Sequence, residues 1–368
     1  MKRKPKVLYD YQIFHTQLFG GISRYFVELI ERLRLFDSQL AIRVSANQYI
    51  CGDKRFRYLA LPKRIFKIFS GQIRKINVAD SLKQIRKGDY DIFHPTYYSS
   101  YFLDALNGKP FVLTIHDMTH EIFPQYFSAN DMTSINKKVL AEKADRIIAI
   151  SQSTKNDVIR ILGIDESKID VIYHGINKQQ LAVGRPANLP EKYILYVGER
   201  RGYKNFESTA KAFAEIKKTH PDLALVLTNR DLSHSEHELF NELGIADSVH
   251  VFSFVSDQVL RQLYRNAAVF VYPSLYEGFG IPILEAFAQD CPVALSDASC
   301  FPEVAGDAGE YFDPQSVESQ VQAIARLLDD ESHRNALIAK GRARLDLFTW
   351  HDTAIKTEET YERVLSKQ

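Results

Sequence analysis

The sequence predicts an α/β protein with two domains, each built on a parallel β-sheet that is covered by helices on both faces. Short apolar runs of strand length alternate with longer helical patterns through most of the chain, and this alternation is typical of βαβ units. A length of 368 residues is more than one hydrophobic core usually covers, which predicts two domains. With 45% hydrophobic and 25% charged residues, the composition is that of an ordinary globular protein.

The composition gives no sign of a membrane span, a secretion signal or a nucleic-acid partner. No run of eighteen apolar residues occurs, and the N-terminus passes into a strand-like segment without the apolar core of a signal peptide. Cys51, Cys291 and Cys300 form no CxxC pair and no even framework, which predicts reduced thiols. The net charge of +1 exerts no general attraction for nucleic acid. We therefore expect a cytoplasmic protein.

The first strand is expected at 6–9, and a glycine pair follows it. Gly20 and Gly21 stand in front of an amphipathic helix, within FGGISRYFVELIERL. The N–H groups at the start of a helix attract anions, so the pair is either an anion-binding loop or a plain flexible turn. The GxGxxG fingerprint of dinucleotide-binding proteins is absent.

The segment 54–87 is strongly basic and carries apolar residues between its charges. Between Asp53 and Lys87 the sequence has eleven lysines and arginines and two acids, Asp53 and Asp80. Such a segment either rests on an anionic membrane surface or holds an acidic acceptor, or else it is a solvated helix face.

Aromatic residues follow the short strand expected at 92–94. Asp89 and Asp91 precede this strand and spell DxD, which we interpret as a charged loop because no ligand-spaced histidine or acid accompanies it. Tyr97 and Tyr98 follow the strand, at the edge where the cleft of an open α/β sheet lies. They are candidates either for contact with an acceptor substrate or for packing.

A further strand, expected at 111–115, delivers His116 and Asp117 to its carboxyl end. Ligands gather at this edge of open α/β sheets, although a single histidine is often structural. The next strand, at 146–150, leads into a helix with Ser151 or Ser153 as a plausible N-cap.

The polar, proline-bearing stretch 177–192 is interpreted as a linker. It separates a first domain at 1–176 from a second at 193–348, and a final helix is expected within 349–368. The second domain begins with a strand at 193–197. After it, three cations gather beside the turn into a helix, where they can form charge-assisted hydrogen bonds with a diphosphate. These cations are Arg200, Arg201 and Lys204.

The most informative stretch is VFVYPSLYEGFGIPILEAFA, at 269–288. It predicts a strand, a glycine loop and a helix that starts near Gly280 and Ile281, and such a helix start suits a phosphate or diphosphate. Glu277 lies in the loop and Glu285 about one turn into the helix. Ionised carboxylates only accept hydrogen bonds, so beside a diphosphate they should face the hydroxyl groups of a sugar and a ribose. A nucleotide-sugar is the ligand that fits.

The run EGFGIPILEA within this stretch resembles the E-x7-E signature of retaining glycosyltransferases of the GT-B fold, in family 4. The resemblance covers nearly the full chain and is strongest at 197–314. It implies two facing Rossmann-like domains, the first binding the acceptor and the second the nucleotide-sugar. It also implies a C-terminal helix that crosses back to the first domain.

Residue roles follow from the same resemblance. The segment LTIHDMTHEIFPQYF is similar to the family's HD motif, which implies that His116 is an active-site residue near the reacting carbon. Lys204 matches the family's phosphate-binding lysine. The family's Arg-Lys-Asn run reads Tyr-Lys-Asn here, so the arginine role falls to Arg200 or Arg201. Glu277 is implied to hold sugar hydroxyls and Glu285 the ribose.

The remaining donor contacts come from a base-binding segment and from glycine loops. Phe254 and Val255 resemble the segment that holds the nucleotide base, although apolar residues before a helix are usually core. Backbone groups around the diphosphate are implied at Gly20, Gly21, Gly278, Phe279, Gly280 and Ile281. Asp117 is added to Tyr97 and Tyr98 as a weaker acceptor contact. No metal and no cofactor are expected.

The segments GGISRYF and EVAGDAG look most like bacterial mannosyl-type transferases of surface polysaccharide assembly, such as O-antigen synthesis. This implies GDP-mannose as donor, a lipid-linked oligosaccharide or glycan as acceptor, and peripheral attachment to the inner face of the cytoplasmic membrane. Two alternatives stay open. A nucleotide-sugar epimerase would convert the donor without an acceptor, and a non-catalytic subunit would bind the donor without hydrolysis or transfer.

Overall fold

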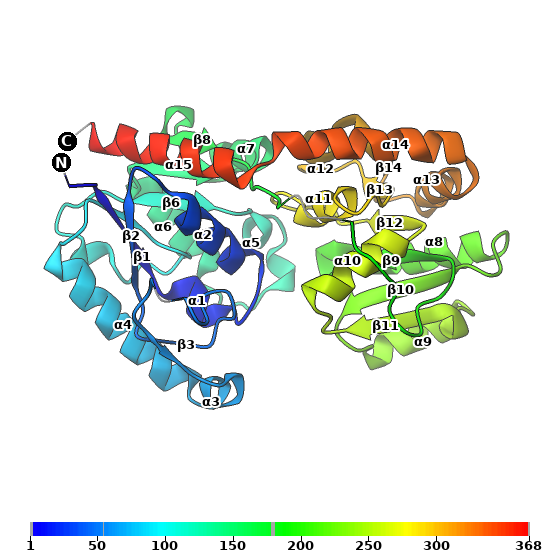
Figure 1. Cartoon of the computed structure of the whole chain (residues 1–368), viewed down its shortest axis with the longest axis horizontal. Helices are drawn as coiled ribbons and strands as arrows, with labels where there is room; N and C mark the ends of the chain where they lie inside the picture. Colours follow the sequence, from blue (N-terminus) through cyan, green and yellow to red (C-terminus); the bar gives the residue numbers. More distant parts are fainter. Residues whose placement is uncertain (1–2, 54, 178–180, 367–368) are drawn as a thin grey trace. The chain divides into compact units, whose positions relative to one another are not determined.

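The structure, a computed structural model, describes residues 3–53, 55–177 and 181–366. The chain forms two compact units: unit 1 comprises 1–175 and 350–368, and unit 2 comprises 176–349. Each unit contains parallel strands and covering helices (Figure 1). The predicted α/β class with parallel sheets is confirmed.

The strands of unit 1 form two short parallel sheets and one two-stranded ribbon. The first sheet has the order β2-β1-β5 and the second the order β6-β7-β8, and a bridge between Phe93 and Phe111 connects them. The ribbon pairs β3 with β4. The bounds are β1 Lys6–Asp10, β2 Asp37–Ala41, β3 Val44–Ser45, β4 Leu59–Ala60, β5 Ile92–His94, β6 Val112–Ile115, β7 Arg146–Ala149 and β8 Ile169–Val171.

In unit 1, the helix expected after the strand at 146–150 begins at a side-chain N-cap. Ser151 caps its helix by accepting a hydrogen bond from the Thr154 N–H, which confirms one of the two N-caps expected there. The bounds are α1 Gln12–Thr16, α2 Gly21–Arg32, α3 Lys63–Ile68, α4 Ser70–Lys87, α5 Thr119–Ile122, α6 Thr133–Lys143, α7 Gln152–Leu162 and α15 Trp350–Leu365.

The last helix, α15, completes the core of unit 1. Its Trp350 and Tyr361 are buried in one cluster with residues of β1 and α2. The Tyr361 hydroxyl lies 2.9 Å from the Tyr9 hydroxyl and 2.7 Å from His94 Nδ1. The chain therefore returns to its first unit after the second, which confirms the predicted C-terminal helix that crosses back.

Unit 2 contains a six-stranded parallel sheet in the order β11-β10-β9-β12-β13-β14. After β9, the chain adds β10 and β11 on one side and then β12, β13 and β14 on the other. The order therefore reverses between β9 and β12, and ligands of open α/β sheets bind at such a point. The bounds are β9 Tyr193–Tyr196, β10 Ala224–Asn229, β11 Val249–Ser253, β12 Val269–Tyr272, β13 Val293–Ser296 and β14 Glu310–Phe312.

Four helices of unit 2 begin at a side-chain N-cap, namely those capped by Ser233, Ser256, Ser316 and Asp330. Ser233 and Glu236 form a reciprocal capping box, and Gly341 of α14 lies so close to Phe287 of α11 that a Cβ would come within 2.6 Å of its ring. The bounds are α8 Phe206–Lys217, α9 His234–Glu242, α10 Asp257–Asn266, α11 Ile281–Phe287, α12 Phe301–Ala305, α13 Val317–Asp329 and α14 Glu331–Arg344.

The stretch interpreted as a linker, 177–192, includes residues 178–180, which lie outside the described residues. Its described part from 181 onward lies on unit 2, where the Ala182 N–H donates to Gln289 and Gln262 donates to the Val183 carbonyl. Cys51, Cys291 and Cys300 carry free thiols, as predicted. Within the described part of the chain, no helix combines the length and apolarity that crossing a bilayer requires.

Candidate active site

The loops that follow β9 and β12 meet at the carboxyl edge of the sheet in unit 2. The two strands are parallel neighbours, with Ile194 paired to Val269 and Leu195 to Phe270. Parallel neighbours end at the same edge, so residues 197–204 and 273–280 are brought together. The Leu275 N–H donates to the Tyr203 carbonyl at 2.8 Å and joins the two loops.

Lys204 and Glu277 contact each other at this edge. Lys204 Nζ donates to Glu277 Oε1 at 2.6 Å, and the Ser274 hydroxyl donates to the same oxygen at 2.8 Å. Burial and the nearby Glu277 carboxylate raise the pKa of Tyr272, so its hydroxyl stays protonated beside them. The side chains of Lys204 and Glu277 are 21% and 14% exposed, so a ligand can still reach both.

The loop from Glu277 to Gly280 is fixed by hydrogen bonds to its main chain and by the packing of one aromatic residue. The Glu277 carbonyl accepts hydrogen bonds from Ser299 Oγ at 2.6 Å and from Cys300 Sγ at 3.2 Å. Gly278 follows, and Phe279 is buried with its ring 5.6 Å from that of Phe348. The carboxylate of Glu277 therefore projects from a fixed main chain.

Gly280 is required by both its conformation and its surroundings. Its φ of 92° lies in the left-handed region, and a Cβ would approach Ile283 to 3.1 Å and Phe301 to 3.3 Å. Ile281 then begins α11. Pro282 has no N–H, and the Ile283 N–H donates to the Gly280 carbonyl at 2.9 Å, so among the first three residues of α11 the Ile281 N–H is the group that this turn can offer to an anion.

Residues expected at the ribose and the base also lie on unit 2. Glu285, in the second turn of α11, is half-buried and accepts a hydrogen bond from the Tyr264 hydroxyl at 3.4 Å. Phe254 follows β11 and is 72% exposed, with a positive φ of 51° fixed in part by its N–H bond to the Asn229 carbonyl. Val255 is half-buried. Phe254 is thus an exposed ring and no part of the core.

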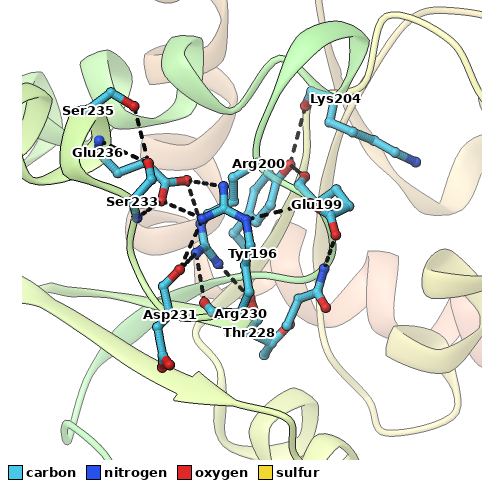
Figure 2. Close-up of polar contacts among 11 residues, drawn as sticks. Tyr196, Glu199, Arg200, Lys204, Thr228, Arg230, Asp231, Ser233, Ser235 and Glu236 are labelled. Carbon is cyan, nitrogen blue, oxygen red and sulfur yellow. Dashed lines mark hydrogen bonds and ion pairs between the residues drawn. The ribbon is translucent and has the colours of Figure 1, made fainter. Parts of the chain in front are cut away.

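Arg200 is buried, and its guanidinium is engaged on three sides (Figure 2). Its Nε donates to Glu236 at 2.8 Å, its Nη1 to the Thr228 carbonyl at 2.7 Å, and its Nη2 to the carbonyls of Arg230 and Asp231 at 2.7 and 2.9 Å. These bonds tie the loop after β9 to the loop after β10. Arg200 therefore has a structural place in the fold.

Arg201 is the other arginine considered for the phosphate. It is exposed and precedes the 3₁₀ turn Gly202–Lys204, whose last residue reaches Glu277. Figure 2 shows the Lys204 side chain extending away from the cluster around Arg200. Of the two arginines, Arg201 is the one that can reach a ligand, and it stays the predicted phosphate contact.

Electrostatic compensation keeps Glu236 ionised inside that cluster. Burial raises the pKa of this carboxyl, but hydrogen bonds from Arg200, from the Ser233 N–H and from Arg230 outweigh burial and hold the pKa at about 2. The charge of Arg200 is thus matched by a buried carboxylate rather than by a ligand.

The glycine pair of unit 1 starts α2, as its position in the sequence suggested. Gly20 is the N-cap and Gly21 the first helical residue. The Gln17 side chain lies against them: a Cβ on Gly20 would come within 2.6 Å of Gln17 Oε1, which accepts the Ser23 N–H at 3.0 Å. One N–H of this helix start is therefore satisfied by Gln17.

His116 lies at the carboxyl end of β6, buried among aromatic rings. Its ring is parallel to that of His174 at 6.0 Å and perpendicular to that of Tyr25 at 5.2 Å. Its backbone N–H donates to the Tyr98 hydroxyl at 2.9 Å, and Nε2 is buried without a hydrogen-bond partner among the described residues. Burial lowers the pKa of His116 to about 4, so the imidazole is neutral near pH 7.

Asp117 follows and is held within unit 1. Burial raises its pKa, but the charge of Lys137 and hydrogen bonds from Thr119 outweigh burial, so the pKa lies below its ordinary value. The Lys137 ammonium is buried and donates to the Asp117 carbonyl and to Glu121, each at 2.9 Å. These contacts make Asp117 an ionised residue that fixes the start of α5.

A cavity of about 530 Å³ opens in unit 1 beside Tyr97 and Tyr98, which both line it. Its wall is formed by α1, the start of α4, the segment after β5 and the start of α6. It contains tyrosine rings together with amide, hydroxyl and charged groups. The lining residues are Tyr11, Gln12, His15, Thr16, Ser70, Gly71, Arg74, Tyr97, Tyr98, Ser99, Asp131, Met132, Thr133 and Asn136.

Two protein-family models match the chain. The model described as Glycosyltransferase Family 4 matches residues 19–180, and the model described as Glycosyl transferases group 1 matches residues 177–344. The chain belongs to the group 1 glycosyltransferases. Together the two matches extend over both units.

Curated relatives of this glycosyltransferase include several mannosyltransferases. The O-antigen chain mannosyltransferase B of Escherichia coli is 28% identical over 289 residues, which are 74% of each chain. The O-antigen chain mannosyltransferase RfbU of Salmonella typhimurium is 30% identical over 234 residues, 62% of this chain and 64% of the relative.

Solved structures similar to this glycosyltransferase have the GT-B fold, so the predicted fold class is confirmed. The sucrose-phosphate synthase of Thermosynechococcus elongatus superposes with a TM-score of 0.77 at 21% identity, over all of both chains. HepE of Anabaena, in complex with UDP and glucose, superposes with a TM-score of 0.75 at 16% identity, over 98% of this chain and all of HepE.

Several residues of the glycosyltransferase that stand beside the candidate groups were not singled out by the sequence. Ser274 bonds Glu277, Gln17 caps the glycine pair, and Arg74 lines the cavity of unit 1. Ser274 lies three residues before Glu277 and Gln17 six residues before Ser23, whose N–H it accepts, and such short spacings are a usable signal in a loop or before a helix. Arg74 had no such signal, because it is one of many cations in its segment.

Across residues 3–53, 55–177 and 181–366, no group of three or more histidine, cysteine or acidic side chains could hold a metal ion. In the DxD run, Lys6 Nζ lies 3.0 Å from Asp89, and the Lys6 N–H donates to Asp91 at 2.7 Å. The expectation of a metal-independent reaction stays a prediction.

Proposed function

We propose that this glycosyltransferase moves a mannosyl residue from GDP-mannose to a hydroxyl group of a glycan or lipid-linked oligosaccharide, with retention of the anomeric configuration. The observation that carries the proposal is the contact between Lys204 and Glu277 at the point where the strand order of unit 2 reverses. This contact brings together, at one edge of the sheet, a cation that can bind phosphate and a carboxylate that can accept hydrogen bonds from sugar hydroxyls.

The donor diphosphate is assigned to Lys204, Arg201 and the start of α11. An ammonium group has three donors, so Lys204 can bond a phosphate oxygen while it keeps its bond to Glu277. The bond from the anomeric carbon to the phosphate oxygen breaks in the reaction, and negative charge develops on the departing diphosphate. Hydrogen-bond donors that are fixed at the diphosphate therefore stabilise the transition state more than the ground state.

Glu277 is assigned to the sugar and not to nucleophilic attack. Its Oε1 already accepts two hydrogen bonds, from Lys204 and Ser274, which orient the carboxylate as an acceptor for sugar hydroxyls. In the proposed step the acceptor oxygen bonds the anomeric carbon on the face from which the diphosphate departs, and the leaving phosphate oxygen takes the acceptor proton. Glu285 is assigned to the ribose and Phe254 to the base.

Unit 1 is assigned to the acceptor. The buried imidazole of His116 is neutral, and its Nε2 has no hydrogen-bond partner among the described residues. We assign this nitrogen to a sugar hydroxyl near the reacting carbon, where it adds no charge. The cavity beside Tyr97 and Tyr98 combines aromatic rings with amide and hydroxyl groups, which is the chemistry that binds sugar rings.

The mannosyl donor is inferred from the relatives, several of which are O-antigen mannosyltransferases. A thermal-shift screen with GDP, UDP, ADP and dTDP and their sugars tests it. GDP and GDP-mannose should raise the Tm, since a ligand at about 100 times its Kd stabilises by about 2.7 kcal/mol. A shift with UDP or another nucleotide alone would contradict the GDP assignment.

A transfer assay then tests the reaction itself. GDP-mannose with an oligosaccharide acceptor should give a product whose new linkage is α, read from the one-bond C–H coupling of its anomeric carbon. A β linkage would contradict retention. Conversion of the donor without an acceptor would indicate an epimerase, and tight donor binding without any turnover would indicate a non-catalytic subunit.

A further inference from the structure

Four large apolar side chains are exposed along α3, the first half of α4 and the residue between these two helices. Ile65, Ile68, Phe69 and Ile76 are 42%, 66%, 50% and 47% exposed. Other apolar residues of the same segment, Phe66 and Ile73, are buried and satisfy its packing on unit 1. The four exposed side chains therefore do not contribute to the hydrophobic core of unit 1. Figure 1 shows α3 and α4 along the periphery of this unit.

The exposed apolar residues share one side of the helical path. Counted from Ile65, the others follow at three, four and eleven residues, spacings that return to the same side of a helix. The path continues across the boundary of the two helices, because the Phe69 N–H donates to the Ile65 carbonyl and the Ile73 N–H to the Phe69 carbonyl. We call this set, with the cations beside it, the α3–α4 surface.

Its cations are Lys63, Arg64, Lys67 and Lys75, which are all exposed. None of the four forms an ion pair with any described residue, whereas exposed lysines elsewhere do, as Lys211 does with Glu207 at 2.7 Å. Between 61 and 87 the sole acid is Asp80, and it accepts a hydrogen bond from Gln84. The charge of this surface is therefore not neutralised within the segment.

We infer that the α3–α4 surface docks on a membrane that contains anionic phospholipid. The apolar side chains would enter the boundary between headgroups and acyl chains, while the lysine and arginine side chains contact lipid phosphates. A second copy of the chain fits less well. Two such surfaces meeting in a symmetric dimer would place cations against cations.

The same helix connects this surface to the cavity of unit 1. Ser70, Gly71 and Arg74 at the start of α4 line that cavity, while Ile68, Phe69 and Ile76 are exposed beside them. Ser70 and Arg74 follow Ile65 at five and nine residues, which places them on the opposite side of the helix from the exposed apolar residues. A membrane docked on the apolar side would therefore be separated from the cavity by this helix, and a lipid-linked substrate would reach the cavity around it. This last step rests on the proposed function, whereas the docking does not.

Vesicle binding by the full chain, without donor or acceptor, tests the docking. The chain should sediment with vesicles of phosphatidylcholine and phosphatidylglycerol in equal parts and not with phosphatidylcholine alone. Raising NaCl from about 0.1 M to about 1 M should release most of it, because the Debye length falls from about 10 Å to about 3 Å. Glycerol phosphate at the same headgroup concentration should not compete, since it offers no surface to the apolar residues.

Two variants separate the charges from the apolar side chains. Combining Lys63→Gln, Lys67→Gln and Lys75→Gln should weaken binding on the order of 100-fold, since each cation near an anionic surface contributes about 1 kcal/mol. Combining Ile68→Ser and Phe69→Ser should weaken it by at least about 10-fold. Leu347→Ser and Lys356→Gln, at exposed positions outside the α3–α4 surface, are the matched controls and should bind as the parent does.

Three results would overturn the docking: equal binding to neutral vesicles, unchanged binding by both variants, or self-association through this surface in the absence of vesicles, seen by sedimentation velocity. The thermal shift of each variant with GDP separates this inference from the proposed function. A variant that loses vesicle binding and keeps its nucleotide shift supports the docking, whatever sugar is transferred.

Discussion

Lys204 donates a hydrogen bond to Glu277, although 73 positions separate the two residues in the sequence. Each side chain could be assigned a chemical role from its own neighbourhood, a cation after one strand and a carboxylate in a glycine loop. Their contact shows that the two side chains belong to one site. At the residue scale the candidate site is therefore a shared cation, available to a carboxylate and to a phosphate at once.

Replacing this cation should slow the reaction more than it weakens the fold. Lys204→Ala removes a donor to the departing diphosphate, and turnover should fall by about 10²–10³, the loss typical of a transition-state hydrogen-bond donor. The measurement is the initial rate of donor consumption with acceptor present. Lys211→Ala, on the neighbouring helix α8 and exposed, is the control. A folded Lys204→Ala protein with full turnover would contradict the assignment.

At the element scale, the loop after β9 contains two adjacent arginines, one with a buried side chain and one with an exposed side chain. Arg200 is buried and bonds three carbonyls and a carboxylate, while Arg201 is exposed beside the turn that ends at Lys204. The backbone reverses the side-chain direction from one residue to the next. One arginine therefore stabilises the connection between two strands, and its neighbour can reach a ligand.

The same substitution should reduce the stability of the protein strongly at Arg200 and hardly at Arg201. Arg200→Met removes the side-chain donor to the Thr228 and Arg230 carbonyls and one of the two arginines that bond Glu236, which keeps its bonds from Arg230 and the Ser233 N–H. The free energy of unfolding should fall by about 3 kcal/mol, the lower end for a broken buried ion pair. Arg201→Met should change it by less than about 0.5 kcal/mol. Urea unfolding measures both, and each variant is the control of the other.

Donor affinity completes this comparison. Arg201→Met should weaken GDP binding about 10-fold or more, since a hydrogen bond to a charged group contributes about 1.5–3 kcal/mol. An unchanged Kd for Arg201→Met, measured by calorimetry, would remove Arg201 from the phosphate site. A stable Arg200→Met protein with weakened donor binding would show instead that Arg200 acts on the ligand.

At the scale of the whole molecule, the chain passes through unit 2 and returns to unit 1 with α15. Tyr361 of this helix contacts Tyr9 of β1 and His94 of β5, and all three side chains are buried. Unit 1 therefore contains segments from both ends of the described chain, and its core is complete only when α15 is in place.

Buried histidines in this core should make unit 1 sensitive to acid. Burial lowers the pKa of His94 to about 3 and that of His116 to about 4, so both stay neutral in the folded state while the unfolded chain binds protons near pH 6.5. Because the unfolded state binds more protons, stability should be full above about pH 6.5 and fall as the pH drops toward 4.

Urea unfolding across this pH range measures the effect, and His94→Gln supplies the comparison. Glutamine keeps a donor and an acceptor for Tyr361 and Thr114 but has no proton to bind. The variant should lose stability less steeply between pH 6.5 and 4 than the parent, whatever its stability at pH 7. Identical slopes would show that His94 is not neutral in the folded state.

The sequence by itself determined the local features of this protein. The alternation of strands and helices, the glycine loop before α11 and the N-cap at Ser151 depend on neighbouring residues, whose backbone preferences and hydrogen-bonding groups are visible in one stretch. The family signature at 277–286 could likewise be recognised from neighbouring residues, because they all lie on one loop and one helix.

Only the tertiary structure decided which of these features share a place. The order of strands in the sheet of unit 2 sets the contact of Lys204 with Glu277, and the depth of the loop after β9 sets the burial of Arg200. Likewise, the sequence identified a basic segment, but packing determined that Phe66 is buried while Ile68 and Phe69 are exposed. Burial and long-range pairing depend on how distant segments meet, and no single stretch of sequence contains that information.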